Sequence, residues 1–161
     1  MMTISDDIDR RILAELARDG RRSAAELAEG LGLSRQAVHT RVRALEKAGV
    51  IRGYHADVDP AALGHGLRAH LRLTLQGSAA RERELVRRLS RHPQVRTIHR
   101  VSGEDCFMVD VVCAEMQDVS SLLGELRDTG ALQSSRTAFV LESLLERGCL
   151  GALEPARKGK K

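Results

Sequence analysis

The feature that most constrains the fold is a set of three short helical patterns within the first 50 residues. The first runs from a cap at Ser5 to Gly20, and its apolar residues recur at helical spacing: Ile8, Ile12, Leu13 and Leu16. The second starts with Ser23 and Glu26, a capping box in which each side chain satisfies the other residue's backbone amide. Residues 32–34, Gly-Leu-Ser, then lead into a third helix. A glycine-containing turn of this length between two helices predicts a helix-turn-helix.

The third helix, from its cap at Ser34 to Gly49, separates two kinds of side chain. Its apolar residues fall on one face: Val38, Val42, Leu45 and Ala48. Its polar residues project from the other face: Arg35, Gln36, His39, Thr40 and Arg43. Arginine can pair with guanine and glutamine with adenine in the major groove, so the exposed N-terminal turn of this helix is predicted to read base edges. Ser34 is also predicted to contact DNA. Arg41, Lys47 and Arg52 are predicted to contact phosphates. The alternative is an arginine-rich solvent face on an ordinary helical domain.

Charge and composition narrow the classes of protein. The chain carries a formal net charge of +4, and residues 35–52 hold five basic side chains against one acidic one. Such a concentrated positive face suits a polyanion. The N-terminus begins with aspartates rather than a basic signal, and no apolar run approaches the roughly 18 residues of a membrane span, so we expect a soluble cytoplasmic protein with no membrane partner. Three cysteines without metal-ligand spacing predict no zinc site, no disulfide framework and no cofactor.

A break in the pattern divides the chain. Val50, Ile51, Tyr54 and Val58 are interpreted as a strand or wing that completes a winged helix-turn-helix over residues 1–58. Residues 59–66 contain one proline and two glycines and are interpreted as a linker. Residues 67–146 are expected to form a second domain, and residues 147–161 a flexible basic tail.

The second domain alternates strands and helices. From residue 67 to residue 76, leucine and alanine alternate with polar residues, which is typical of a strand with one buried face. The later elements are expected at residues 79–91 (helix), 95–101 and 107–113 (strands), around 119–126 (helix) and 135–144 (strand). The order βαββαβ predicts a ferredoxin-like sheet with both helices on one side, and hence an α+β protein.

Several local phrases resemble one known family. They are Asp9-Arg-Arg-Ile-Leu13, Leu27-Ala28, Gly32-Leu-Ser34, Arg41-Val-Arg-Ala-Leu-Glu46, Gly49-Val-Ile-Arg-Gly-Tyr54, Asp59-Pro60, Leu63-Gly64, His92-Pro-Gln-Val95 and Ser102-Gly103. In these phrases, and in the order of its elements, the chain resembles the leucine-responsive and asparagine regulator family (Lrp/AsnC) of bacterial and archaeal transcription factors. The resemblance spans residues 6–142 and implies a sequence-specific regulator that binds double-stranded DNA.

The same resemblance implies how the second domain works. Members form homodimers through their C-terminal sheets, often assemble into tetramers or octamers, and bind an amino acid or similar small effector between subunits. The positions that match the effector site are Gly103, Glu104, Asp105, Cys106, Ser135 and Thr137. Two departures stand out: Cys106 replaces the aspartate of many members, and Ala131-Leu132 replaces their Gly-Val. An ordinary hairpin with capping acids is the alternative for residues 103–106.

Three other functions compete with this prediction. The chain lacks GxSxG, HExxH, a phosphate-binding glycine loop and a clustered His/Cys set, so we expect no enzyme. A βαββαβ sheet can bind RNA by stacking bases on aromatic residues, but only Phe107 and Phe139 fall in the predicted sheet. The third alternative is a DNA-binding regulator or architectural protein whose C-terminal domain only oligomerises and binds no effector.

Overall fold

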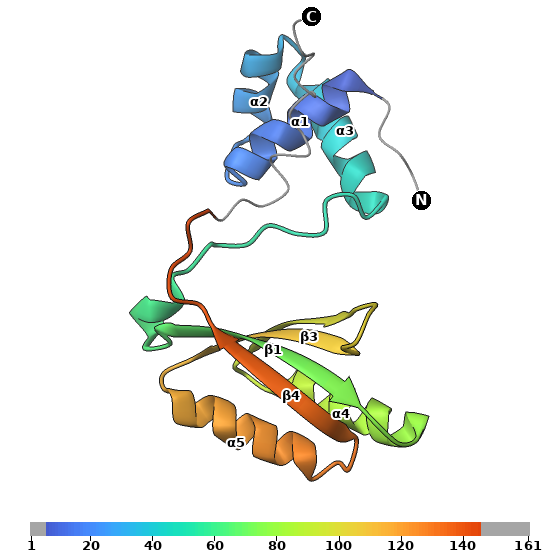
Figure 1. The fold of residues 1–161 in the computed structure, drawn as a ribbon. Coiled ribbons are helices and arrows are strands. Elements are labelled where there is room, and N and C mark those ends of the chain that lie inside the picture. The colour runs from blue at the N-terminus through green and yellow to red at the C-terminus, as the bar shows by residue number, and fades with distance from the viewer. Residues whose placement is uncertain (1–5, 146–161) are drawn as a thin grey trace, which may run out of the picture. The chain divides into compact units, whose positions relative to one another are not determined.

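The computed structural model of the chain describes residues 6–145, whose ribbon is drawn in Figure 1. These residues separate into two units: residues 6–57 with Leu144 and Leu145 form one, and Val58–Ser143 forms the other. No helix within this range is both long and apolar enough to cross a membrane. The predicted basic tail and Cys149 lie outside the described residues.

The N-terminal unit holds three helices: α1 (Asp7–Arg18), α2 (Ala24–Leu31) and α3 (Arg35–Lys47). The cap of α1 is Asp6, whose side chain accepts a hydrogen bond from the Ile8 amide at 2.8 Å; the cap predicted at Ser5 is therefore wrong, and Ser5 itself lies outside the described residues. The capping box of Ser23 and Glu26 is confirmed. Ser34 caps α3 as predicted, accepting the Ala37 amide at 3.1 Å.

Glycine and a small apolar core fix the angle between α2 and α3. Gly32 adopts a left-handed conformation with φ of 68°, which closes α2 in a way that other residues rarely allow. Among the described residues of the unit, five side chains are buried: Ile12, Leu27, Ala28, Val38 and Leu45. They come from all three helices, so this small core holds the helix-turn-helix together.

The strand or wing predicted after α3 is wrong in one respect, because residues 50–58 form no strand. A strand is stable only when a neighbouring strand takes its backbone hydrogen bonds, and these residues pair with no described strand. Side-chain contacts place the segment instead. The Tyr54 hydroxyl donates to Glu46 Oε1 at 3.0 Å, and its ring lies against Gly20. Burial and Glu46 raise the pKa of Tyr54.

The C-terminal unit begins with a 3-10 helix, η1 (Pro60–Leu63), within the predicted linker. Six elements follow: β1 (Leu67–Leu75), α4 (Ala79–Arg91), β2 (Val95–Arg100), β3 (Phe107–Cys113), α5 (Met116–Arg127) and β4 (Leu132–Phe139). The sheet order is β2-β3-β1-β4, and every pair is antiparallel. Both helices lie on one side of the sheet (Figure 1), so the predicted ferredoxin-like βαββαβ fold is confirmed.

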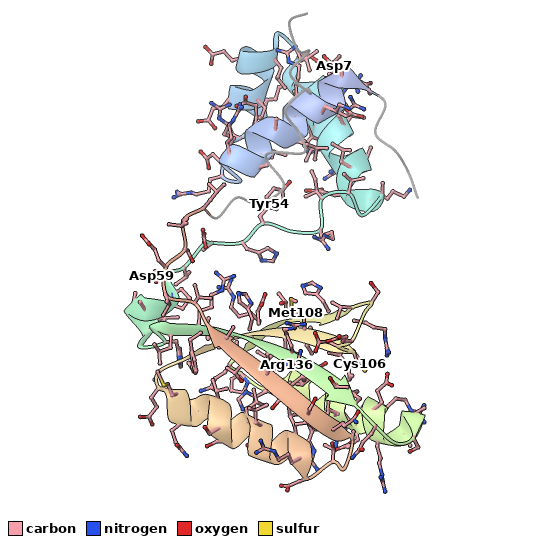
Figure 2. All side chains as sticks on the ribbon, viewed as in Figure 1. Asp7, Tyr54, Asp59, Cys106, Met108 and Arg136 are labelled. Carbon is pink, nitrogen blue, oxygen red and sulfur yellow. The ribbon has the colours of Figure 1, made fainter. Side chains whose placement is uncertain are left out.

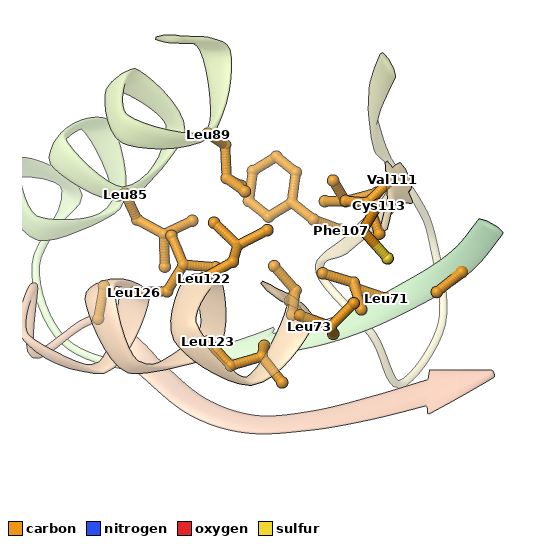
Figure 3. Packing of buried hydrophobic residues seen from close by; sticks show 14 residues of the cluster. Leu71, Leu73, Leu85, Leu89, Phe107, Val111, Cys113, Leu122, Leu123 and Leu126 are labelled. Atoms are coloured by element: carbon orange, nitrogen blue, oxygen red, sulfur yellow. The ribbon is translucent and has the colours of Figure 1, made fainter. Parts of the chain in front are cut away.

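The core of this unit lies between the sheet and the two helices (Figure 3). Its largest fully buried side chains are Leu71, Leu73, Leu85, Leu89, Val109, Val111, Cys113, Leu122 and Leu126. The alternation along β1 and β3 sends every second residue into this core, and the remaining residues point to the opposite face of the sheet. We call that opposite side the open face.

The last strand differs from the prediction. We expected residues 135–144, but β4 runs from Leu132 to Phe139. Pairing explains both ends: Leu132 lies opposite Leu75, and Phe139 lies opposite Ala69. β4 is an edge strand whose residues are mostly polar and exposed, so no alternation of apolar residues marked it in the sequence.

Candidate nucleic-acid interface and ligand site

Helix α3 presents the two faces that its sequence predicts. Val38 and Leu45 are buried. The residues predicted to meet DNA are exposed: Ser34, Arg35, Gln36, His39, Thr40, Arg43 and Lys47, with Arg52 beyond the helix. The Thr40 hydroxyl donates to the Gln36 carbonyl at 2.9 Å, so its donor is already used within the helix. Arg35 and Gln36 occupy the first turn, where a recognition helix carries its base-reading side chains.

Four exposed cations of this surface lack an acidic partner among the described residues. Arg35, Arg43, Lys47 and Arg52 form no ion pair with another residue of the described part of the chain. A guanidinium or ammonium group without a carboxylate partner is free to displace counterions from a phosphate. The surface around α3 therefore has the electrostatic character of a polyanion-binding surface.

Arg41 differs from the other predicted contacts. Its side chain is 32% exposed, and Nη1 hydrogen-bonds to Asp6 Oδ2 at 2.7 Å and to Asp9 Oδ1 at 2.8 Å. These two carboxylates raise the pKa of Arg41. The structure thus brings Arg41 together with the start of α1 and separates it from the unpaired cations.

Two basic residues ahead of α2 were missed by sequence reasoning. Arg21 and Arg22 are both exposed and stand directly before the cap at Ser23. Arg22 pairs with Glu15 and also lines a pocket of about 130 Å³ that reaches His39 and Tyr54. Their place in the sequence was a usable signal. The first helix of a helix-turn-helix crosses the DNA backbone, and these arginines directly precede that helix.

The predicted effector turn, residues 103–106, is hydrogen-bonded to the end of β1. The Cys106 amide donates to the Leu73 carbonyl at 2.8 Å, and Cys106 Sγ accepts from the Leu75 amide at 3.4 Å. The Val101 amide donates to the Cys106 carbonyl at 3.1 Å and closes the turn. Gly103 has a φ of 112°, a conformation that L side chains rarely adopt, and a Cβ there would meet nothing within 4 Å. The turn is therefore held at its base and open at its tip.

Two ion pairs connect this turn to the open face. Arg72 Nε donates to Asp105 Oδ2 at 2.6 Å, and the Asp105 side chain is only 10% exposed. Glu104 lies 3.7 Å from Arg136 of β4, and both side chains are well exposed. Figure 2 labels Arg136 and Cys106 on this unit. Both signs of charge thus stand beside the turn, as a ligand with an ammonium and a carboxylate group requires.

Ser135 and Thr137 point to the other side of the sheet. They pair with Leu73 and Leu71, which belong to the core, whereas Arg136 pairs with Arg72 on the open face. Residues directly opposite in an antiparallel pair share a face. The structure therefore brings Glu104 and Asp105 to the arginines and leaves Ser135 and Thr137 at the helix side of the edge strand.

A second polar cluster occupies the open face. Asp110 accepts from the Thr97 hydroxyl at 2.7 Å and lies 2.5 Å from His70 Nδ1. Burial raises the pKa of Asp110, but the hydrogen bonds from Thr97 and His70 outweigh it and hold the pKa below its usual value. The cluster makes this face polar and ordered.

Two family models match the chain, one on each side of the linker. Residues 5–52 match a winged helix-turn-helix DNA-binding model, and residues 68–150 match the Lrp/AsnC ligand binding domain. The second match covers the turn at residues 103–106 and all four strands.

Curated and solved proteins give the same family. The HTH-type transcriptional regulator AldR of Mycolicibacterium smegmatis is 36% identical over 141 residues, which cover 86% of this chain and 82% of AldR. A transcriptional regulator of Neisseria meningitidis, solved as an L-Met complex, superposes with a TM-score of 0.84 at 26% identity and covers 90% of this chain and 94% of its own. Escherichia coli AsnC has a TM-score of 0.81 at 27% identity, with 91% and 98% covered. The chain therefore belongs to the Lrp/AsnC family of HTH-type transcriptional regulators.

Proposed function

We propose that this regulator binds its operators as a homo-oligomer, reads bases with α3, and changes its DNA affinity when an amino acid binds between subunits. Residues 1–58 would bind DNA, and residues 67–146 would sense and assemble. The proposal includes no catalysis and no cofactor, and it places the protein in the cytoplasm, where the DNA of bacteria and archaea lies. The observation that carries it is the exposed first turn of α3, which presents Gln36 and an Arg35 that has no ion pair within residues 6–145.

The proposed contacts fall into two groups. Arg35, Gln36, His39 and Arg43 would reach base edges, because they project from the exposed side of the recognition helix. Ser34, Lys47, Arg52 and Arg21 would contact the backbone, because they lie at or beyond the ends of the helices. Phosphate contacts set the orientation, and base contacts set the preferred sequence.

Replacing the first-turn residues tests this assignment. Arg35→Ala and Gln36→Ala should each reduce discrimination between the best duplex and a one-base variant by about 1 to 3 kcal/mol, because each removes a bidentate base contact. Competition binding against single-base variants of a duplex selected from a random library would measure the change.

Lys47→Ala is the matched control, since it also removes an exposed group of α3 that has no ion partner among the described residues. It should weaken all duplexes alike and shallow the dependence of log K on log salt by about one unit. Unchanged base preference in both Arg35→Ala and Gln36→Ala would take α3 out of the major groove.

The effector site is proposed at the turn of residues 103–106. Arg72 and Arg136 can bind a carboxylate, Glu104 and Asp105 can bind an ammonium group, and the open tip at Gly103 admits a ligand. The match to the family's ligand binding domain and the L-Met complex of the Neisseria regulator support an amino acid as the ligand. Ser135 and Thr137 would take part from the helix side of β4, where a second subunit can approach the edge strand.

Assembly is proposed through the sheet. Within the described residues of the C-terminal unit, no helix lies on the open face, which presents Met108, 37% exposed, among polar side chains. A two-fold pair of such faces would bring two recognition helices to two half-sites. The alternative is a C-terminal domain that only oligomerises, in which case no amino acid would change DNA affinity.

A further inference from the structure

We propose that Arg41 is a positioning residue that holds the recognition helix against α1, and that it does not contact a DNA phosphate. Its partners Asp6 and Asp9 stand 35 and 32 residues earlier in the sequence, at the start of α1. A single nitrogen, Nη1, joins both carboxylates at 2.7 and 2.8 Å. The contact therefore fastens two helices at one point.

The position of Arg41 on α3 suits this role. It follows buried Val38 by three residues and precedes buried Leu45 by four, so it flanks the side of the helix that faces the core. Arg35 and Arg43, in contrast, are exposed and have no ion pair within residues 6–145. The same helix thus uses arginines for two different tasks.

Asp6 connects the pair to the start of α1. One of its oxygens accepts the Ile8 amide and caps the helix, while the other accepts from Arg41. The hydrogen bond from Arg41 and that from Ile8 lower the pKa of Asp6, so this carboxylate stays ionised at neutral pH. A rotation of α3 away from α1 would therefore separate Arg41 from Asp6, the residue that caps α1.

Charge argues against a phosphate contact. One guanidinium between two carboxylates leaves a local formal charge of −1, and an approaching phosphate would meet both acids. Such a group releases few counterions from DNA. Lys47 and Arg52 have no such neighbours among the described residues and remain suited to phosphate.

The sparse packing of α1 explains why an ion pair between α1 and α3 matters. Ile12 is the one fully buried residue of α1, so few apolar contacts fix the rotation of this helix against the others. A recognition helix must hold its base-reading side chains to within about 0.5 Å to discriminate between bases. We therefore expect the Arg41 pair to affect the choice of sequence more than the general affinity for DNA.

Four variants of the full chain test the proposal: Arg41→Ala, Arg41→Lys, Asp9→Asn and, as the control, Lys47→Ala. Each is measured on a selected duplex and on a scrambled duplex, from about 50 to 200 mM salt. Arg41→Ala and Asp9→Asn should both lower the ratio of the two affinities about two- to five-fold, the range of a surface ion pair, with the salt slope unchanged. Arg41→Lys should fall between them and the wild type, because an ammonium group lacks the planar fork of arginine.

The control separates the two roles. Lys47→Ala should shallow the salt slope by about one unit and leave the affinity ratio unchanged. The proposal is overturned if Arg41→Ala behaves like Lys47→Ala, or if neither the ratio nor the slope changes in Arg41→Ala and Asp9→Asn. Circular dichroism reports whether each variant is folded. If Arg41→Ala is unfolded, the result for Asp9→Asn decides, because this variant keeps the shape of the Asp9 side chain and the pair between Arg41 and Asp6.

Discussion

A fragment that ends at residue 66 is expected to bind a selected operator about 10²- to 10⁴-fold more weakly than the full chain. The fragment keeps the three helices and their buried core, so its own contacts with one half-site should survive. It loses the sheet that we propose to join two subunits, and with it the second recognition helix on the same DNA. One short helix covers too few base pairs to select a site in a genome.

The measurement is a titration of fragment and full chain against the same duplex at one salt concentration. Circular dichroism of the fragment shows whether its helices remain, which separates a lost partner from a lost fold. A duplex with a single half-site is the control, because both proteins should bind it with similar affinity at concentrations where one recognition helix acts alone. Full affinity of the fragment for the two-half-site duplex would contradict the assembly role of the second domain.

An amino acid is expected to change the DNA affinity of the full chain about 5- to 150-fold and to shift its oligomer distribution in parallel. A ligand changes an equilibrium only through its different affinity for the two states, so one coupling free energy, about 1 to 3 kcal/mol, must appear in both measurements. Calorimetry against the common amino acids identifies the ligand, and sedimentation with and without it gives the assembly.

Gly103→Trp should abolish both responses, because the new side chain would occupy the open tip of the turn. Gly64→Trp is the matched control. Gly64 also has a positive φ, 83°, and open space around its Cβ, but it precedes β1, whereas the turn lies at the far end of that strand. The control should therefore also place a side chain at a positive φ and keep the response. If no amino acid binds, or if one binds without changing assembly or DNA affinity, the C-terminal domain is an oligomerisation device alone.

Elements with strong local signals could be predicted from the sequence. α4 and β3 were predicted at their observed bounds, because His92-Pro93 marks the end of the first and the tight turn before Phe107 marks the start of the second. The caps at Ser23 and Ser34 carry their own chemistry and were also found. The order of these elements, together with local phrases of sequence, then carried the family resemblance.

The remaining features depend on contacts between distant residues. β4 begins opposite Leu75, the last residue of β1, and ends opposite Ala69, and its own sequence carries no signal for either limit. Residues 50–58 contain strand-forming residues but have no described partner strand. The pairing of Arg41 with Asp6 and Asp9 joins residues more than 30 positions apart, so a local pattern could only place Arg41 among the cations of α3.

The most direct test of a sequence-reading regulator is the ratio of two affinities of the full chain, measured at one salt concentration. One duplex is selected from a random library, and the other has the same composition in scrambled order. A specific regulator should bind the selected duplex about 10³-fold more tightly or better. Equal affinity for both duplexes would contradict base reading by α3 and leave a protein that binds DNA through its charge alone.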